Sequence, residues 1–379
     1  MKASHEFQIL VKPAGPICNL GCQYCYYLDK KDLYPKDESL QMPYEVLEEY
    51  ITQHIQASPE NAIMFSWHGG EPTILGLDYF RMIVNLQRKH KPRNMKIING
   101  IQTNGTLLDK DWCQFFSKEG FTVGLSLDGP KDMHDKYRKT KDQKSTFEKV
   151  MRGYYLLQKY RVHTEILCVV NHCNVCFPLQ VYNFFKEING QYITFLPLVE
   201  RENDFGAEVS KISVPAELWG DFLIKIFDEW IDKDIGKIKI QIFEEALRTA
   251  FNQEHSLCIF RPTCGDIPVV EHNGDFYSCD HYVNEEHLLG NITETTLVDL
   301  LESPAQIAFG RIKLETLPRY CRECEVISMC NGECPKNRFI TTPDGEPGLN
   351  YLCAGYKRFF NHCQPFVSQV ARLWHQQTQ

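Results

Sequence analysis

The chain has 379 residues, of which 43% are hydrophobic and 24% are charged, a balance that indicates a globular protein and excludes a disordered one. Its formal net charge of −8 gives no support for binding to nucleic acid or to an anionic membrane. The N-terminus lacks the apolar core of a signal peptide, and no apolar run approaches the length of a bilayer span, so we expect a cytoplasmic protein.

The first two thirds of the chain alternate short apolar runs with amphipathic segments. The apolar runs predict strands at 7–11, 62–67, 95–102, 121–127, 162–170 and 192–196. The amphipathic segments predict helices at 43–56, 77–89, 109–118, 146–160 and 179–188. Such alternation predicts βαβ units and a parallel sheet, in which functional sites gather where the strands end.

The alternation ends after about Pro197. Residues 214–233 predict one amphipathic helix, whose aromatic and aliphatic stripe we interpret as core. Beyond it the sequence predicts short elements, many turns and clustered cysteines. We therefore expect two domains, at 1–235 and 236–379.

A group of three cysteines directly follows the first predicted strand. Cys18, Cys22 and Cys25 have the spacing C-x3-C-x2-C, and thiolates favour iron–sulfur clusters, zinc or copper. Sixteen cysteines are many for a reducing compartment, where disulfides are rare and metal binding is the default explanation. Three ligands leave one position of a four-coordinate centre open to a substrate. The alternative is a structural zinc knuckle with its fourth ligand elsewhere in the chain.

A second and larger group of cysteines lies in the C-terminal part. Eight thiols are enough for two four-thiolate centres, and two zinc sites fit the spacing as well as two iron–sulfur clusters do. The sequence alone does not say which four belong together. The group consists of Cys258, Cys264, Cys279, Cys321, Cys324, Cys330, Cys334 and Cys353.

Several motifs carry a resemblance to a known family. The C-x3-C-x2-C loop resembles the signature of radical S-adenosylmethionine (radical SAM) enzymes, and the post-strand HGGEP at 68–72 resembles their GGE motif. The eight-cysteine region resembles the SPASM extension. The segments 102–107 (QTNGTL), 124–130 (GLSLDGP) and 331–338 (NGECPKNR) are similar to anaerobic sulfatase-maturating enzymes, over roughly residues 11–360.

This resemblance implies a partial (β/α)6 barrel, similar to a TIM barrel, followed by a SPASM domain. It implies three 4Fe–4S clusters and S-adenosylmethionine as cofactors. The SAM cluster would be held by Cys18, Cys22 and Cys25. One auxiliary cluster would be held by Cys258, Cys264, Cys279 and Cys334, and the other by Cys321, Cys324, Cys330 and Cys353.

The resemblance also implies the residues around S-adenosylmethionine. Gly69, Gly70 and Glu71 would meet its methionine end, and Ser126 and Arg138 its carboxylate. Tyr27, Gln102 and Leu196 would line the cofactor or substrate side. Some family members carry Gln where His68 stands, and both side chains can donate a hydrogen bond.

Asp280 directly follows Cys279, so its carboxylate is held near a cysteine of the auxiliary group. An ordinary solvated aspartate is the simplest interpretation from the sequence alone. The resemblance favours a second interpretation, in which Asp280 is the general base that removes the thiol or hydroxyl proton of the substrate.

The implied activity is oxidation of a Cys or Ser in a sulfatase peptide to Cα-formylglycine. It begins with cleavage of S-adenosylmethionine to methionine and a 5′-deoxyadenosyl radical, which takes a hydrogen atom from the β-carbon of the target. The implied partners are an unfolded sulfatase segment with the pattern Cys/Ser-x-Pro-x-Arg and an electron donor such as flavodoxin or ferredoxin. The net negative charge of the chain is favourable for binding the Arg of this segment.

Two alternatives remain at this level. One is another peptide maturase on the same scaffold, which forms thioethers or other crosslinks in a ribosomal peptide. The other is a zinc-stabilised interaction protein without catalysis.

The sequence also contains thiols outside the two cysteine groups. We expect Cys113 and Cys168 to be small core residues and Cys363 to be incidental. Cys173 and Cys176 form a C-x2-C that could hold a metal or redox site.

Overall fold

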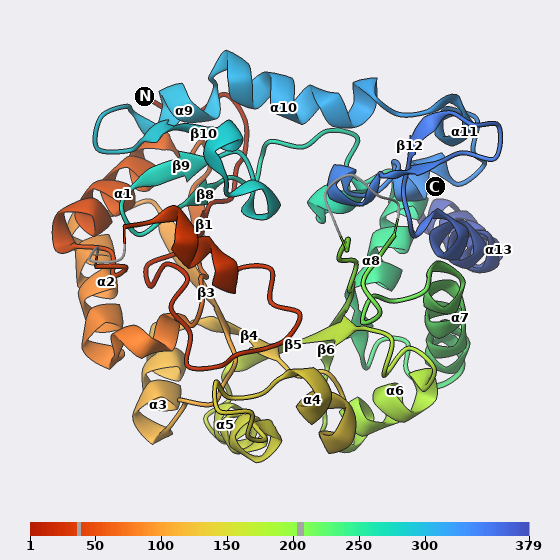
Figure 1. Ribbon diagram of the computed structural model, residues 1–379, viewed down its shortest axis with the longest axis horizontal. Helices are drawn as coiled ribbons and strands as arrows, with labels where there is room; N and C mark the ends of the chain where they lie inside the picture. Colours follow the sequence, from red (N-terminus) through yellow and green to blue (C-terminus); the bar gives the residue numbers. More distant parts are fainter. Residues whose placement is uncertain (36–38, 203–207, 379) are drawn as a thin grey trace. The chain divides into compact units, whose positions relative to one another are not determined.

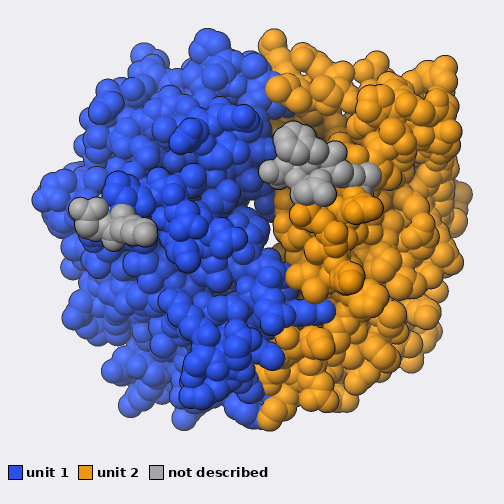
Figure 2. All heavy atoms as spheres, in the orientation of Figure 1, with its two compact units in different colours: residues 1–126, 137–164, 265–310 blue, residues 127–136, 165–264, 311–379 orange. Residues whose placement is uncertain are grey.

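The computed structural model describes residues 1–35, 39–202 and 208–378 and divides the chain into two compact units (Figure 2). Unit 1 comprises residues 1–126, 137–164 and 265–310, and unit 2 comprises residues 127–136, 165–264 and 311–379. Both units are therefore assembled from segments far apart in the sequence. The predicted domains at 1–235 and 236–379 divide the chain at a single point, and that boundary stays a prediction.

Unit 1 contains parallel strands in chain order (Figure 1). β1 (Leu10–Val11) pairs with β2 (Ala62–Trp67), β2 pairs with β3 (Lys96–Thr103), and β3 pairs with β4 (Thr122–Ser126). On its other edge β1 pairs in parallel with β8 (Val269–Val270), which is followed by antiparallel β9 (Asp275–Tyr277) and β10 (Leu288–Asn291). Residues of the C-terminal cysteine region thus extend the N-terminal sheet.

The helices of unit 1 begin and end at recognisable signals. In α3, for example, Asp109 caps the first turn by accepting from the Trp112 backbone N–H at 3.0 Å, and Gly120 ends the helix in the left-handed region at φ 69°. The helices are α1 (Tyr44–Ala57), α2 (Leu77–His90), α3 (Lys110–Glu119), α5 (Phe147–Lys159) and α9 (Leu297–Leu301), with short 3₁₀ turns at Leu28–Leu33, Pro72–Leu75, Asp280–Tyr282 and Glu285–His287.

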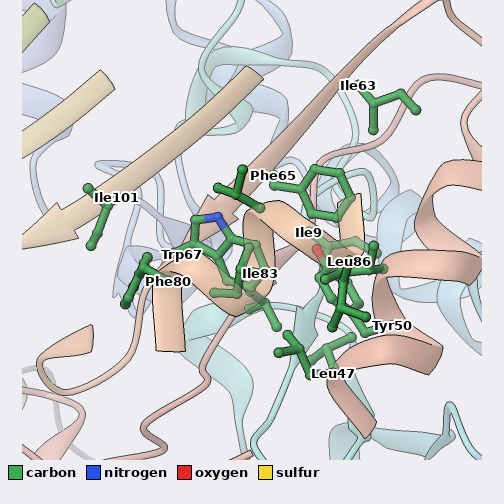
Figure 3. Close-up of a cluster of buried hydrophobic side chains, with 14 of the residues drawn as sticks. Ile9, Leu47, Tyr50, Ile63, Phe65, Trp67, Phe80, Ile83, Leu86 and Ile101 are labelled. Carbon is green, nitrogen blue, oxygen red and sulfur yellow. The ribbon is translucent and has the colours of Figure 1, made fainter. Parts of the chain in front are cut away.

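The core of unit 1 lies between the sheet and α1 and α2 (Figure 3). From β2, Phe65 and Trp67 stack at 5.8 Å between ring centroids, and Tyr50 of α1 meets both edge-on. Trp67 is fully buried, and its indole N–H donates to Asn99 at 2.8 Å, which satisfies the one polar atom it takes into the core. The strongly apolar run at 62–67 is therefore a central strand.

Unit 2 contains most of β5 (His163–Val170), the parallel strands β6 (Tyr192–Pro197) and β7 (Lys239–Ile240), and a small hairpin of β11 (Ile340–Thr341) and β12 (Pro347–Leu349). Its 3₁₀ turns lie at Thr249–Phe251, Cys258–Phe260 and Pro335–Asn337. Its helices are α4 (Lys131–Tyr137), α6 (Pro178–Glu187), α7 (Ala216–Lys233), α8 (Gln241–Arg248), α11 (Arg319–Arg322), α12 (Ile327–Cys330) and α13 (Cys353–Thr378).

Helices α7 and α13 lie side by side (Figure 1), and two glycines allow their close approach. A Cβ on Gly355 would lie 2.2 Å from the Ala216 carbonyl oxygen, and a Cβ on Gly220 would lie 2.8 Å from the Gly355 oxygen. Only residues without a side chain fit there. The start of α13, which carries Cys353, is thereby fixed against α7.

The predicted α/β class with parallel strands is confirmed, and each predicted strand and helix of the first two thirds has a counterpart within a few residues. The prediction of short elements after residue 236 is wrong in part, because α10 (Pro304–Glu315) and α13 are long helices. Among the described residues, no helix combines the length and the apolar character that crossing a bilayer would require.

Candidate radical SAM site

The loop of three cysteines follows β1 and is held by backbone hydrogen bonds to residues 137–140. The Gly21 N–H donates to the Lys139 oxygen at 2.8 Å, and the Gln23 N–H donates to the Tyr137 oxygen at 3.0 Å. Cys18, Cys22 and Cys25 are each half-buried. Three soft thiol donors thus share one tethered loop, which is the donor set that an iron–sulfur cluster with one open iron requires.

The Gly69-Gly70-Glu71 segment after β2 docks directly on this loop. The Gly70 N–H donates to the Gly15 oxygen and the Glu71 N–H donates to the Ile17 oxygen, both at 2.8 Å. A Cβ on Gly70 would lie 2.0 Å from the Ile17 oxygen, inside any permitted contact. The motif therefore needs glycine because its backbone touches the backbone of the cysteine loop.

The Glu71 carboxylate is 1% exposed and accepts four hydrogen bonds from the protein. It accepts from the Thr73 N–H at 3.1 Å, the Thr73 hydroxyl at 2.6 Å, the Thr103 hydroxyl at 2.7 Å and the Asn104 N–H at 2.7 Å. Burial raises the pKa of Glu71, and these hydrogen bonds act in the opposite direction. The side chain joins β3 to the glycine segment, and its contact with the methionine end of S-adenosylmethionine stays a prediction.

Replacing Glu71 by Gln should destabilise the chain by about 1–3 kcal/mol, because the new amide places a donor against donors in a buried position. Urea unfolding measures this change. S-adenosylmethionine should also bind more weakly, which equilibrium dialysis measures. Glu45→Gln, at an exposed position in the first turn of α1, is the matched control and should stay within about 0.5 kcal/mol of the parent. Equal stability of the two variants would contradict the bracing role of Glu71.

Asn104 connects the end of β3 to the cysteine loop. Its amide N–H₂ donates to the Asn19 oxygen at 2.9 Å and to the Cys18 sulfur at 3.8 Å, and the Leu20 N–H also donates to that sulfur at 3.4 Å. Burial raises the pKa of the Cys18 thiol to about 12, and the Leu20 hydrogen bond opposes this. Metal binding deprotonates a thiol, and these donors stabilise the thiolate that results.

The remaining residues implied for the cofactor lie in both units. In unit 1, Gln102 donates to the Ser126 hydroxyl at 3.0 Å from the adjacent strand, and Arg138 lies over the Tyr24 ring at 5.3 Å. Tyr27 is buried and its hydroxyl donates to the Glu271 carboxylate. Leu196 lies at the end of β6 in unit 2, where it is partly exposed.

Asp280 lies in unit 1 at the start of a 3₁₀ turn and forms an ion pair with Lys12. The Lys12 Nζ is 2.5 Å from the Asp280 carboxylate, and the two side chains are 2% and 14% exposed. The Tyr26 hydroxyl donates to the other carboxylate oxygen. Burial alone would raise the pKa of Asp280, but the charge of Lys12 and these hydrogen bonds hold it below its usual range.

Lys12 is the functional candidate that the sequence analysis missed. It directly follows the apolar run of β1, and a lysine at the end of a buried strand is the signal that could have indicated it.

The charge of Lys12 also affects the pKa of His68, at the start of the HGGEP segment. Burial lowers the pKa of His68 to about 4 and Lys12 adds to the effect, so the ring is neutral at pH 7.

Four of the eight C-terminal thiols lie together in unit 2. Cys321 of α11, Cys324, Cys330 of α12 and Cys353 at the start of α13 line one pocket. This is the second set that the family resemblance implies. Of the first set, Cys258, Cys264 and Cys334 belong to unit 2, whereas Cys279 follows β9 in unit 1.

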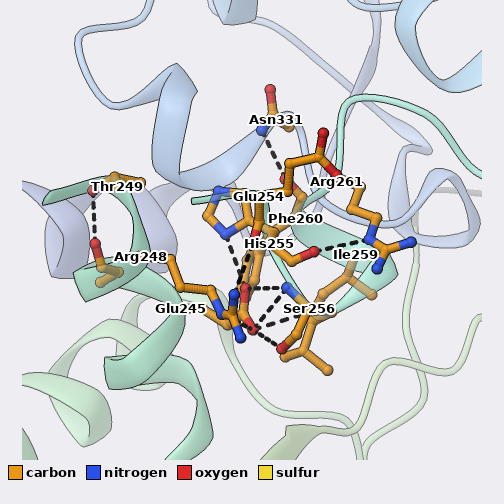
Figure 4. A network of polar contacts seen from close by, with 12 residues as sticks. Glu245, Arg248, Thr249, Glu254, His255, Ser256, Ile259, Phe260, Arg261 and Asn331 are labelled. Atoms are coloured by element: carbon orange, nitrogen blue, oxygen red, sulfur yellow. Dashed lines mark hydrogen bonds and ion pairs between the residues drawn. The ribbon is translucent and has the colours of Figure 1, made fainter. Parts of the chain in front are cut away.

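The turn that carries Cys258 is anchored by Glu245 of α8 (Figure 4). The buried carboxylate accepts from the Ser256 N–H at 3.1 Å and faces the His255 Nδ1 at 2.9 Å, while the His255 Nε2 faces the Ser328 oxygen at 2.9 Å. The His255 ring thereby bridges the Glu245 carboxylate and the Ser328 backbone carbonyl. It ties the turn before Cys258 to the helix that ends in Cys330.

The remaining thiols mostly meet expectation. Cys113 and Cys168 are fully buried core residues, as predicted. Cys363 is also fully buried and donates to the Phe360 oxygen from within α13, so it belongs to the packing of that helix. Cys173 is half-buried and Cys176 exposed, in the loop after β5.

Comparisons with known proteins agree with this geometry. The family model described as the radical SAM superfamily matches residues 13–175, and that described as the iron–sulfur cluster-binding domain SPASM matches residues 258–325. A serine-type anaerobic sulfatase-maturating enzyme of Bacteroides thetaiotaomicron is 46% identical over 373 residues, which is 95% of this chain and 90% of that protein. A cysteine-type enzyme of Clostridium perfringens is 35% identical over 369 residues, or 96% and 98% of the two chains.

A solved structure, native anSMEcpe with bound AdoMet, matches with a TM-score of 0.88 at 34% identity and covers 96% of this chain and 99% of that chain. The same enzyme with AdoMet and the Cp18Cys peptide matches with a TM-score of 0.87. The predicted fold class is therefore confirmed, as is the dependence on S-adenosylmethionine and 4Fe–4S clusters. The chain belongs to the anaerobic sulfatase-maturating enzymes of the radical SAM superfamily.

Proposed function

We propose that this chain oxidises a Cys or Ser side chain in a sulfatase peptide to Cα-formylglycine, with Asp280 as the general base. The observation that carries the proposal is the buried ion pair between Lys12 and Asp280, beside Cys279. It keeps the carboxylate ionised and ready to accept a proton throughout the neutral pH range.

The cofactors supply, when bound, the 5′-deoxyadenosyl radical that removes a hydrogen atom from the β-carbon of the target. Loss of that hydrogen atom makes the attached hydroxyl or thiol more acidic, so even a carboxylate with a lowered pKa can take its proton. One electron then leaves the substrate and a carbonyl forms from Ser, or a thiocarbonyl that water converts to the aldehyde from Cys. Asp280 would hold the proton, and Tyr26 and Lys12 would hold Asp280.

The proposed cluster ligands are eleven cysteines in three sets. Cys18, Cys22 and Cys25 would hold the SAM cluster, where the backbone of Gly69 and Gly70 closes against the loop. Cys321, Cys324, Cys330 and Cys353, which line one pocket, would hold one auxiliary cluster. The other would take Cys258, Cys264, Cys279 and Cys334, as the family resemblance implies.

The proposed substrate is an unfolded sulfatase segment with the pattern Cys/Ser-x-Pro-x-Arg. The solved relative was determined with a bound peptide, and the 46% identical relative is named a serine-type enzyme. We place the reaction in the cytoplasm, where reduced thiols and an electron donor such as flavodoxin or ferredoxin are available.

Mass spectrometry of two matched peptides tests the proposal. The peptides differ only in Cys or Ser at the target position and are incubated anaerobically with S-adenosylmethionine and a reductant. The Ser peptide should lose the mass of two hydrogen atoms, and the Cys product should have the same final mass. A product whose Cys sulfur is retained in a thioether would contradict formylglycine formation and favour a crosslinking maturase. An unchanged mass for both peptides would also contradict it.

A further inference from the structure

Lys313 of α10 is a buried cation to which the proposed reaction assigns no role. Its side chain is 0% exposed, and its ammonium donates to the carbonyl oxygens of Cys258 at 2.8 Å and Ile259 at 2.7 Å. These carbonyls belong to the turn that presents the Cys258 thiol. Lysines are almost never fully buried unless a negative charge pairs with them, so the position needs a reason.

Thiols of the first auxiliary set lie close enough to Lys313 to interact with its charge. The groups that interact electrostatically with the Lys313 ammonium include Cys264, Cys258, Glu333 and Cys334. The ammonium therefore lies within electrostatic reach of three of the four cysteines in this set.

The loop that presents Cys334 is fixed to the same helix. The Arg338 guanidinium donates to the oxygens of Gly332 at 2.8 Å and Asn331 at 2.9 Å, and to the Lys313 oxygen at 2.5 Å. Asn331 and Glu333 adopt left-handed backbone at φ 47° and φ 52°, which these bonds help to hold. The distance from the Lys313 charge to the thiols is thus set by rigid contacts and not by a mobile side chain.

We propose that Lys313 is a charge-compensating residue that raises the reduction potential of the auxiliary cluster of Cys258, Cys264, Cys279 and Cys334. The proposal rests on that proposed ligand set. Reduction adds one negative charge to a cluster, and a fixed cation in a low-dielectric interior stabilises the reduced form more than the oxidised form. Lys313 would thereby make this cluster a better acceptor for the electron that leaves the substrate.

A reductive titration of the full-length chain, followed by electron paramagnetic resonance, tests the proposal. The parent carries Ala at positions 18, 22 and 25, so only the auxiliary clusters contribute to the signal. At the solution potential that half-reduces the affected cluster of the parent, Lys313→Met should lower the ratio of reduced to oxidised cluster at least tenfold. For a one-electron couple this is a shift of about 59 mV. Lys313→Gln, which keeps a donor without the charge, should show the same decrease, and Lys313→Arg should not.

Lys336→Met is the matched control. It removes the same charge two residues from Cys334, but Lys336 is 28% exposed and paired with Glu200 at 2.9 Å, so solvent screens it. Its ratio should change less than threefold. An unchanged ratio in both neutral variants, or an equal decrease in Lys336→Met, would overturn the proposal. Loss of iron from both neutral variants would also overturn it, because Lys313 would then be needed to retain the cluster and not to set its potential.

Cys334→Ala on the same parent distinguishes this proposal from the ligand set on which it rests. If the set is right, this variant loses the signal of one auxiliary cluster. If both signals remain, the ligand set is wrong whatever the lysine variants show. If one signal is lost and the neutral lysine variants leave the potentials unchanged, Lys313 has no compensating role.

Discussion

Replacing Asp280 by Asn is expected to reduce aldehyde formation by about 10²–10⁴-fold, because an amide keeps the shape of the side chain but cannot accept the substrate proton. Cleavage of S-adenosylmethionine should continue, since neither the cysteine loop nor the Gly69-Gly70 segment is altered. The measurement is the yield of formylglycine peptide by mass spectrometry, set against the yield of 5′-deoxyadenosine from the same reaction. The two yields should become uncoupled in the variant.

A loss of activity in this variant could also follow from instability, because Lys12 would remain buried without its counter-ion. Breaking one partner of a buried ion pair typically costs about 3–5 kcal/mol, whereas removing both charges is often close to neutral. The double variant Lys12→Met/Asp280→Asn should therefore recover the unfolding temperature without recovering aldehyde formation. Glu286→Gln, at an exposed position nearby in the chain, serves as the inert control. Aldehyde formation within tenfold of the parent in Asp280→Asn would exclude Asp280 as the base.

Gly70→Ala is expected to abolish binding of S-adenosylmethionine and to destabilise the chain by about 3 kcal/mol or more. The added methyl would start 2.0 Å from the Ile17 carbonyl oxygen, and the neighbouring atoms are also backbone, so no side chain can rotate away. The cysteine loop and the segment after β2 would have to separate. Equilibrium dialysis with S-adenosylmethionine and urea unfolding measure the two effects.

Gly100→Ala in β3 is the matched control for this substitution. There the added methyl would meet the Thr122 hydroxyl at 3.3 Å, which is a side-chain atom that can shift slightly. Cofactor binding should be retained and the stability should change by about 1 kcal/mol or less. Binding of S-adenosylmethionine to Gly70→Ala with the affinity of the parent would contradict the proposed closure of the glycine segment on the loop.

The sequence was sufficient for elements whose signal is local. The buried strand at 62–67 and the amphipathic helix at 214–233 each carry a pattern of hydrophobic residues that one segment contains entirely. The spacing of Cys18, Cys22 and Cys25 is local in the same way. Helix α13 was missed because it begins at a cysteine of the C-terminal group and contains Pro365, and its stability comes from packing against α7.

The roles of charged side chains depended on contacts that no local pattern contains. Glu71, for example, accepts hydrogen bonds from Thr103 and Asn104, which the end of β3 brings to it from more than 30 residues away in the sequence. No sequence pattern singled out Lys313 or predicted α10, the helix that carries it. Only the fold shows that it is buried over the turn of Cys258.

The pairing of β1 with β8 has a consequence for how the chain is made. Lys12 lies at the end of β1, and its counter-ion, Asp280, follows the hairpin of β8 and β9, more than 260 residues later in synthesis. Until that hairpin leaves the ribosome, one edge of β1 has no strand partner and the lysine has no carboxylate. The N-terminal sheet therefore finishes folding late, and a nascent chain stalled before residue 269 should expose an open strand edge to chaperones and to other chains.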